Sequence, residues 1–194
     1  MTGRVIYLHG FNSSPASSKA AVIQRELARR APGAVFLAPA LPPSPADASR
    51  LLADLAREYP QATLVGSSMG GYYATWLSEQ FALRAVLVNP AVRPYDLLAG
   101  VVGRQKNFHT GVEYDFTDQH IAELRALEVG SISPERYLLL AAKGDEVLDY
   151  RHAVEKYRGA RQIVIEGGDH SLSSFADYVG AALDFCGLAA CSKC

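Results

Sequence analysis

The chain has 194 residues, of which 49% are hydrophobic and 20% charged, and its formal net charge is −1. This length suits one domain, and the composition excludes a disordered chain. The sequence contains no Lys/Arg block of the kind that neutralises phosphates, so we expect no nucleic-acid partner.

Short apolar runs alternate along the chain with longer amphipathic segments. The predicted strands are Arg4–Leu8, Ala34–Leu37, Thr63–Val65, Ala85–Val88, Arg136–Ala142 and Gln162–Ile165. The predicted helices are Pro15–Arg30, Pro45–Tyr59, Met69–Gln80, Tyr150–Tyr157 and Leu172–Phe185. Apolar strands that alternate with helices predict a doubly wound α/β fold with a mostly parallel sheet of about six strands. If strand one lies between strands two and three, the order is 2-1-3-4-5-6.

One region, residues 91–133, breaks this alternation between the fourth and fifth strands. It is about forty residues long, far more than a usual α/β connection, and includes a helical stretch over Asp118–Leu127. A segment of this kind is typical of a lid or binding insertion, although a loop with one extra helix would give the same pattern. We therefore expect one domain over residues 1–187 with a lid-like insertion, followed by a tail over residues 188–194.

The segment Gly66-Ser67-Ser68-Met69-Gly70 fits the pattern G-x-S-x-G. A predicted strand precedes it and a predicted helix follows it, which is the context that a nucleophile elbow requires. The glycines let neighbouring backbone approach a tight turn, and Ser68 is expected in a strained conformation that projects its hydroxyl. A glycine–serine turn that only caps the helix is the alternative.

The first strand ends in His9-Gly10-Phe11-Asn12. Acyl transfer needs two backbone donors for the oxyanion, and this loop is where such folds place one of them. We expect these donors to be the N–H groups of Phe11 and Met69, with Gly10 allowing close approach. His9 is expected to brace the loop by hydrogen bonds, and a direct catalytic role is the alternative.

A base should follow the last strand, in the chain order serine, acid, histidine. Of the five histidines only His170 does so, and His109, His120 and His152 are expected at the surface. The acid should follow the fifth strand, where Asp145 comes just after a glycine. Asp149, which also suits a helix N-cap, is its best rival, and Asp169 is expected to point away from the ring of His170.

Three segments carry a resemblance to a known family: Leu8-His9-Gly10-Phe11-Asn12-Ser13-Ser14-Pro15, Gly66-Ser67-Ser68-Met69-Gly70-Gly71-Tyr72-Tyr73-Ala74 and Gly144-Asp145-Glu146-Val147-Leu148-Asp149-Tyr150. Together they resemble the YqiA-like esterases of bacteria, which are compact α/β-hydrolases. The resemblance covers almost the whole chain before the tail. It implies hydrolysis of acyl esters or acyl-CoA-type thioesters, with Ser68, Asp145 and His170 as the triad.

The predicted reaction proceeds through an acyl-enzyme and uses no metal or organic cofactor. We expect His9, Gly10, Phe11 and Tyr72 to contact a small-molecule acyl substrate. Amide hydrolysis or acyl transfer with the same triad is an alternative, and so is a non-catalytic binding module on the same scaffold.

The first residues lack a secretory leader and no run approaches the length of a membrane span, so a cytoplasmic protein is expected. The three cysteines, Cys186, Cys191 and Cys194, all lie near the C-terminus. Cys191 and Cys194 have no second ligand pair at zinc-like spacing, so we expect ordinary reduced thiols and no metal.

Overall fold

The computed structural model describes residues 3–188, and a parallel sheet of six strands forms its centre. The strand order is β2-β1-β3-β4-β7-β8, and every neighbouring pair in it is parallel. The strands are β1 (Arg4–Leu8), β2 (Val35–Leu37), β3 (Thr63–Ser67), β4 (Arg84–Val88), β7 (Tyr137–Ala142) and β8 (Arg161–Ile165). This order confirms the predicted 2-1-3-4-5-6 arrangement.

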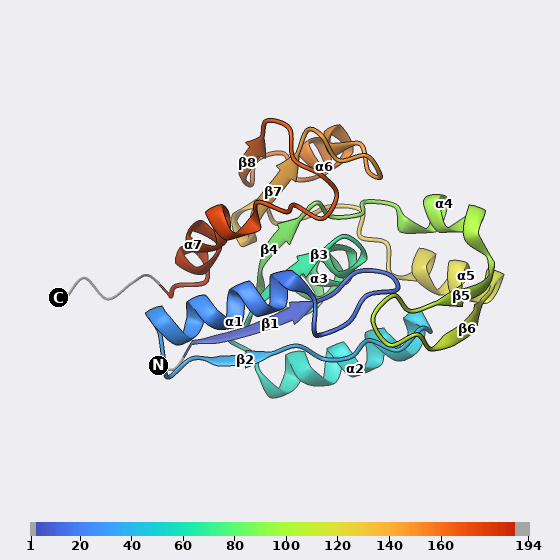
Figure 1. Ribbon diagram of the computed structural model, residues 1–194, viewed down its shortest axis with the longest axis horizontal. Helices are drawn as coiled ribbons and strands as arrows, with labels where there is room; N and C mark the ends of the chain where they lie inside the picture. The colour runs from blue at the N-terminus through green and yellow to red at the C-terminus, as the bar shows by residue number, and fades with distance from the viewer. Residues whose placement is uncertain (1–2, 189–194) are drawn as a thin grey trace.

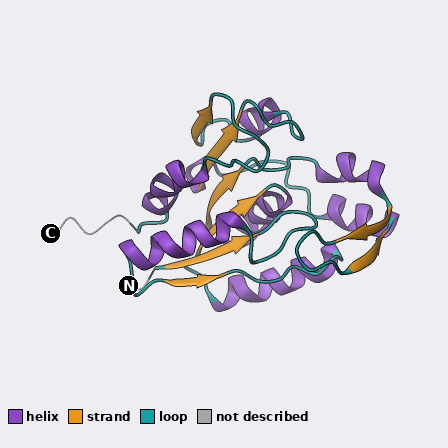
Figure 2. Cartoon of the chain, viewed as in Figure 1, coloured by secondary structure: helices purple, strands orange, loops and turns teal. Residues whose placement is uncertain are grey.

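The central strands are apolar on both faces because helices cover both sides of the sheet (Figures 1 and 2). All six residues of β7 are buried. In β1, Val5 and Tyr7 pack into one core cluster and Ile6 and Leu8 into the other, as the period of a strand requires. The edge strand β8 is less buried, and its Val164 is 37% exposed.

Five helices form the two outer layers. On one face, α1 (Ser18–Arg30) packs beside α7 (Phe175–Phe185), as Figure 1 shows. The other face is covered by α2 (Pro45–Glu58), α3 (Met69–Phe81) and α6 (Tyr150–Lys156). Their buried residues recur at helical spacing, as in Ala48, Leu52 and Ala56 of α2.

Two helices begin three residues later than predicted. Helix α1 starts at Ser18 with Ser17 as its N-cap, because the side chain of Ser14 instead accepts a hydrogen bond from the Ala16 N–H in a preceding turn. Helix α7 starts at Phe175, because Leu172 adopts a positive φ of 45° that ends the preceding loop.

The long connection between β4 and β7 contains more structure than its sequence predicted. Besides α5 (Asp118–Ala126), which was expected, it holds α4 (Pro94–Leu98), η1 (Ala99–Val101), the antiparallel pair β5 (Gly103–Lys106) and β6 (Glu113–Phe116), and η2 (Pro134–Arg136). The pair β5–β6 escaped prediction because these short strands are mostly exposed and carry no apolar alternation.

The connection is fixed over the carboxyl ends of β1 and β3, at the right of Figure 1. The side chain of Asn12, in the loop after β1, makes two hydrogen bonds to this connection. Its amide nitrogen donates to Gln105 Oε1 (3.1 Å), and its amide oxygen accepts from the Tyr114 hydroxyl (2.6 Å). The Phe108 N–H donates to the Asn12 carbonyl oxygen (2.9 Å). Phe116, which is 1% exposed, anchors the same segment in the core.

We predict that Gly70→Ala lowers the free energy of unfolding by about 3 kcal/mol, because overpacking against backbone cannot relax. A Cβ at Gly70 would lie 2.0 Å from the carbonyl oxygen of Leu8, where α3 crosses β1. Urea denaturation followed by circular dichroism measures the loss. Gly33→Ala is the matched control, since a Cβ there meets nothing within 4 Å. Equal stability of the two variants would contradict the prediction.

Candidate active site

Ser68 occupies a strained turn between β3 and α3. Its φ of 55° and ψ of −121° lie in a region that side-chain-bearing residues rarely adopt. Gly66 and Gly70 make the turn sterically possible, because a Cβ at Gly66 would lie 2.4 Å from the Gly70 carbonyl oxygen. Although Ser68 is the N-cap residue of α3, its side chain makes no capping bond. The hydroxyl is therefore directed away from its own helix.

A chain of hydrogen bonds joins Ser68 to two residues from distant loops. His170, after β8, lies with Nδ1 2.9 and 3.0 Å from the carboxylate oxygens of Asp145, which follows β7. The Nδ1–H donates to that carboxylate, so Nε2 of the neutral ring is an acceptor. Nε2 lies 3.0 Å from Ser68 Oγ, whose hydroxyl donates to it. The structure thus brings together the three residues that the sequence selected.

The Asp145 carboxylate is held in its ionised form. Its side chain is only 2% exposed. Burial on its own would raise the pKa, but the His170 ring and the N–H groups of Leu148 and Val147 all donate to the carboxylate and lower the pKa overall. An ionised carboxylate at this position fixes the tautomer of His170 and would stabilise its protonated form.

The other carboxylates considered as the acid are engaged elsewhere. Asp149 is the N-cap of α6 and accepts from the N–H and guanidinium of Arg151. Asp169 accepts from the N–H and hydroxyl of Ser173. Neither carboxylate bonds to the ring of His170 in the described part of the chain.

Two residues that the sequence analysis did not select hold the His170 loop in place. Asn89 is buried, and its amide nitrogen donates to the carbonyl oxygens of Asp169 and His170 at 3.0 Å each. Its amide oxygen accepts from the Ala142 N–H (2.8 Å). Glu146 accepts from the His170 N–H (2.9 Å). The sequence signal that could have identified Asn89 is its position as a polar residue directly after a buried strand, at the edge of the sheet where functional residues gather.

The loop after β1 lies against Ser68. A Cβ at Gly10 would lie 3.3 Å from Ser68 Cβ, so this backbone could not approach as closely with a larger residue. Within residues 3–188, neither the Phe11 N–H nor the Met69 N–H donates a hydrogen bond to another group of the chain. Both residues line the pocket that contains Ser68. Two backbone donors next to a nucleophile are the components of an oxyanion site.

A pocket of about 600 Å³ contains both Ser68 and His170. Its apolar lining includes Phe11, Met69, Leu97, Leu98, Val101, Phe108, Val147 and Leu148. Of the residues expected to contact substrate, Gly10 and Phe11 line it. The pocket therefore combines a reactive hydroxyl with an apolar wall that the 91–133 insertion helps to build.

His9 and Tyr72, which were also expected to contact substrate, do not line this pocket. His9 is 5% exposed, its Nε2 accepts from the Leu41 N–H (3.1 Å), and its Nδ1–H donates to the Gly10 carbonyl oxygen (2.9 Å). Burial lowers the pKa of this neutral ring, which braces the loop. Tyr72 is buried in the core, where its hydroxyl donates to the Leu124 carbonyl oxygen (2.7 Å).

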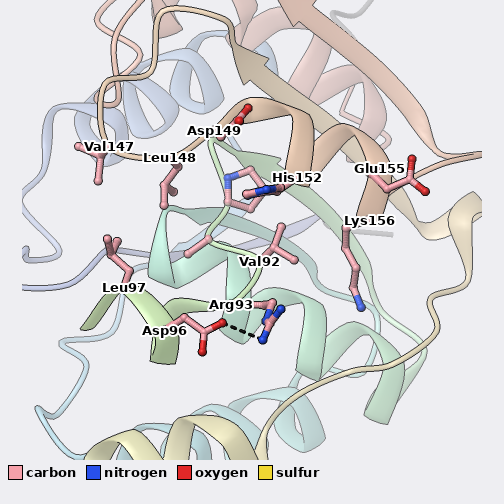
Figure 3. A pocket seen from close by; sticks show the side chains of 12 residues that line it. Val92, Arg93, Asp96, Leu97, Val147, Leu148, Asp149, His152, Glu155 and Lys156 are labelled. Carbon is pink, nitrogen blue, oxygen red and sulfur yellow. Dashed lines mark ion pairs between the residues drawn. The ribbon is translucent and has the colours of Figure 1, made fainter. Parts of the chain in front are cut away.

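A second pocket of about 580 Å³ adjoins the first (Figure 3). The two share the wall formed by Ala91, Leu97, Val147 and Leu148. Figure 3 shows charged side chains around it, including the ion pair between Arg93 and Asp96 (2.9 Å). Of the remaining histidines, His109 lines the first pocket and His152 lines the second. His120 lines neither, and its ring accepts a hydrogen bond from the Thr117 N–H at the start of α5.

Residues 3–188 contain no group of three or more His, Cys, Asp or Glu side chains arranged to hold a metal ion. Among the helices of that range, none has the length and apolar character needed to cross a bilayer. Cys186 is a free thiol whose burial raises its pKa to about 12. Cys191 and Cys194, for which reduced thiols were predicted, lie outside the described residues.

Comparison with known proteins places the fold among the α/β hydrolases. The profile of a family described as "Uncharacterised protein family (UPF0227)" matches residues 4–187. A UPF0227 protein from Shewanella sediminis is 23% identical over 164 residues, which cover 82% of this chain and 85% of that protein.

Two solved structures illustrate the likeness. Est1E from Butyrivibrio proteoclasticus, solved with ferulic acid bound, has a TM-score of 0.70 at 13% identity, covering 93% of this chain and 88% of that one. Alpha/beta hydrolase domain-containing protein 10 from mouse has a TM-score of 0.67 at 15% identity, covering 95% and 90%. These similarities confirm the predicted α/β-hydrolase fold.

We predict that Asn89→Asp destabilises the protein by about 3 kcal/mol and loosens the His170 loop. The variant keeps the shape of the side chain but loses the N–H donors, so a buried carboxylate faces two carbonyl oxygens. Urea denaturation measures the first effect, and amide hydrogen exchange over residues 170–172 measures the second.

Asn107→Asp is the matched control, because Asn107 also donates to a carbonyl oxygen, that of Ser13 (2.7 Å), but is only partly buried. Water can replace its lost donor, and we expect a loss below about 1 kcal/mol. Equal losses in the two variants, with unchanged exchange at residue 170, would contradict the role assigned to Asn89.

Proposed function

The chain belongs to the uncharacterised protein family UPF0227, and from that premise and the geometry around Ser68 we propose that it is a serine hydrolase of acyl esters or acyl-CoA-type thioesters. The observation that carries the proposal is the unbroken chain of hydrogen bonds from Asp145 through His170 to Ser68. A serine activated in this way is the nucleophile of acyl-transfer enzymes on several unrelated folds. The resemblance of three segments to the YqiA-like esterases supports the same reaction class.

The first half-reaction acylates Ser68. His170 Nε2 removes the hydroxyl proton as Oγ attacks the carbonyl carbon of the substrate. The carbonyl oxygen becomes an oxyanion, which accepts hydrogen bonds from the N–H groups of Phe11 and Met69. The tetrahedral intermediate then collapses, and His170 gives its proton to the departing alcohol or thiol. Asp145 stabilises the imidazolium that exists between these two proton transfers.

The second half-reaction releases the acid. A water molecule enters after the leaving group departs, and His170 removes one of its protons as the oxygen attacks the acyl carbon. The bond to Ser68 Oγ breaks, the serine recovers its proton from His170, and the carboxylic acid leaves. Each step uses only the side chains named here, two backbone donors and water.

The apolar lining of the active-site pocket favours a substrate with a hydrocarbon or aromatic part. Phe11, Met69 and Leu98 lie on this lining, and Val101 and Phe108 extend it along the insertion. Burial of such a group supplies about 25 cal/mol per Å² of apolar surface, which is enough to orient a small acyl chain.

We predict that Ser68→Ala lowers kcat/KM for a 4-nitrophenyl ester by at least about 10⁴-fold, and that Asp145→Asn lowers it by about 10³-fold to 10⁴-fold. The first change removes the nucleophile, and the second releases the tautomer of His170. Initial rates followed by nitrophenolate absorbance measure both effects, with circular dichroism to verify folding.

Asp149→Asn is the matched control for Asp145→Asn, because that carboxylate caps α6 and does not contact His170. We expect its kcat/KM to stay within about threefold of the unmodified protein. Full activity of Ser68→Ala would refute the assignment. So would failure of a fluorophosphonate to label Ser68, which would favour a non-catalytic module. Faster turnover of amides than of esters and thioesters would show that the protein is an amide hydrolase and contradict the proposed bond specificity.

A further inference from the structure

Lys19 occupies an unusual position for a lysine. It is the second residue of α1, it is only 8% exposed, and it lines the same pocket as Ser68 and His170. Lysine side chains are rarely buried to this degree unless they are paired with an anion. The position therefore requires a physical explanation.

No partner for this ammonium group is found within residues 3–188. The Lys19 ammonium makes no hydrogen bond, and no carboxylate of these residues lies within 4.0 Å of it. Asp169 is the acid that acts on Lys19 electrostatically, but its carboxylate accepts instead from Ser173. Burial lowers the pKa of Lys19, and the adjacent N-terminus of α1 adds further positive potential.

The other buried or pocket-lining lysines are partnered. Lys156, in the second pocket shown in Figure 3, donates to the carbonyl oxygens of Val129 and Gly130. Lys143 forms an ion pair with Glu166. Lys19 differs from both because no carbonyl or carboxylate oxygen of the described residues bonds to its ammonium group.

The active-site pocket contains no compensating negative charge. Among the described residues that line it, none is an aspartate or glutamate, while Lys19 and the two histidines His109 and His170 carry its only basic groups. Tyr7, Ser17 and Ser67 also line this pocket, and the Ser17 hydroxyl donates to the Tyr7 hydroxyl (3.0 Å). A largely buried lysine without an acidic partner in such a pocket is a complement for an anion that arrives with the ligand.

We propose that Lys19 binds a carboxylate of the substrate, so that the ester or thioester carries a free carboxylate on its acyl or its alcohol part. This inference rests on the proposed function, since it names the substrate class of the same site. Lys19 is the only lysine or arginine among the described lining residues, and one ammonium neutralises one carboxylate, whereas a phosphate monoester with a charge of about −1.5 to −2 would remain partly uncompensated. Lys19 is a specificity-determining residue in this proposal, and it takes no part in the proton transfers.

The test compares two pairs of esters that differ only in a carboxylate. Mono-4-nitrophenyl glutarate is paired with its methyl ester, which tests the acyl side, and 4-acetoxybenzoate is paired with methyl 4-acetoxybenzoate, which tests the alcohol side. In at least one pair we expect the unmodified protein to prefer the carboxylate form by about tenfold or more in kcat/KM, because a charge-assisted bond in a desolvated site is strong. Lys19→Met should abolish that preference, and Lys19→Arg should retain part of it.

Arg25→Met is the matched control, because it removes a cation from the exposed side of the same helix. It should leave the ratio of the two rates unchanged. Lys19→Met should also be at least as resistant to urea as the unmodified protein, since it removes an unpaired buried charge. A lysine with a purely structural role would instead lose stability on substitution and lose rate equally on both esters of a pair.

The proposal is overturned if the unmodified protein prefers neither carboxylate ester, or if Lys19→Met retains the preference. Hydrolysis of the neutral esters by the unmodified protein, and its loss in Ser68→Ala, would then leave the proposed function standing. If no ester is hydrolysed, the proposed function fails, and binding of 4-acetoxybenzoate to the Ser68→Ala protein is followed by amide chemical shifts. Shifts that disappear in the Lys19→Met double variant support the carboxylate site, and shifts that persist refute it.

Discussion

The whole site depends on one backbone conformation, the positive φ of 55° at Ser68. That turn directs the hydroxyl out of the path of α3 and toward the loop after β8, and its cost of about 1–3 kcal/mol must be offset by the surrounding packing. The offset comes from close backbone contacts that only glycine permits at Gly66 and Gly70. The Ser68 N–H donates to the Val88 carbonyl oxygen and the Ser68 carbonyl oxygen accepts from Ala91, so β4 and its following loop also hold the turn.

His170 is held in place through its backbone as well as through its ring. Asn89 donates to the carbonyl oxygens of Asp169 and His170, and Glu146 accepts from the His170 N–H. Asp145 then fixes the ring itself. In the proposed reaction, a base held in this way would not need to reorganise when a proton moves, which is where preorganised sites gain rate. The loop after β7 thus contributes both the acid and a support for the base.

Charge is distributed unevenly around this framework. Asp145 bonds to His170, Asp149 caps α6 and Asp169 bonds to Ser173, and none of the described acids lines the pocket that contains Ser68. The second pocket, by contrast, has a mixed rim in which Arg93 is already paired with Asp96. The two cavities share an apolar wall but differ in electrostatic character. Lys19 bears on the first pocket because it lines that pocket and not the second.

The sequence alone determined the parallel sheet and the selection of Ser68, Asp145 and His170, because these depend on local signals and on their order along the chain. The strand order followed only on the condition that strand one lies between strands two and three, which the structure supplied. Unbroken apolar runs specify buried strands, and a G-x-S-x-G turn between a strand and a helix places its serine at the edge where the other loops end. The sequence could not assign Asn89, Glu146 or Lys19, nor exclude His9 and Tyr72 from the pocket. Those roles follow from which side chain meets which partner across the sheet edge. Contacts between residues as distant as Asn89 and His170 are decided by tertiary packing, since no local pattern encodes them.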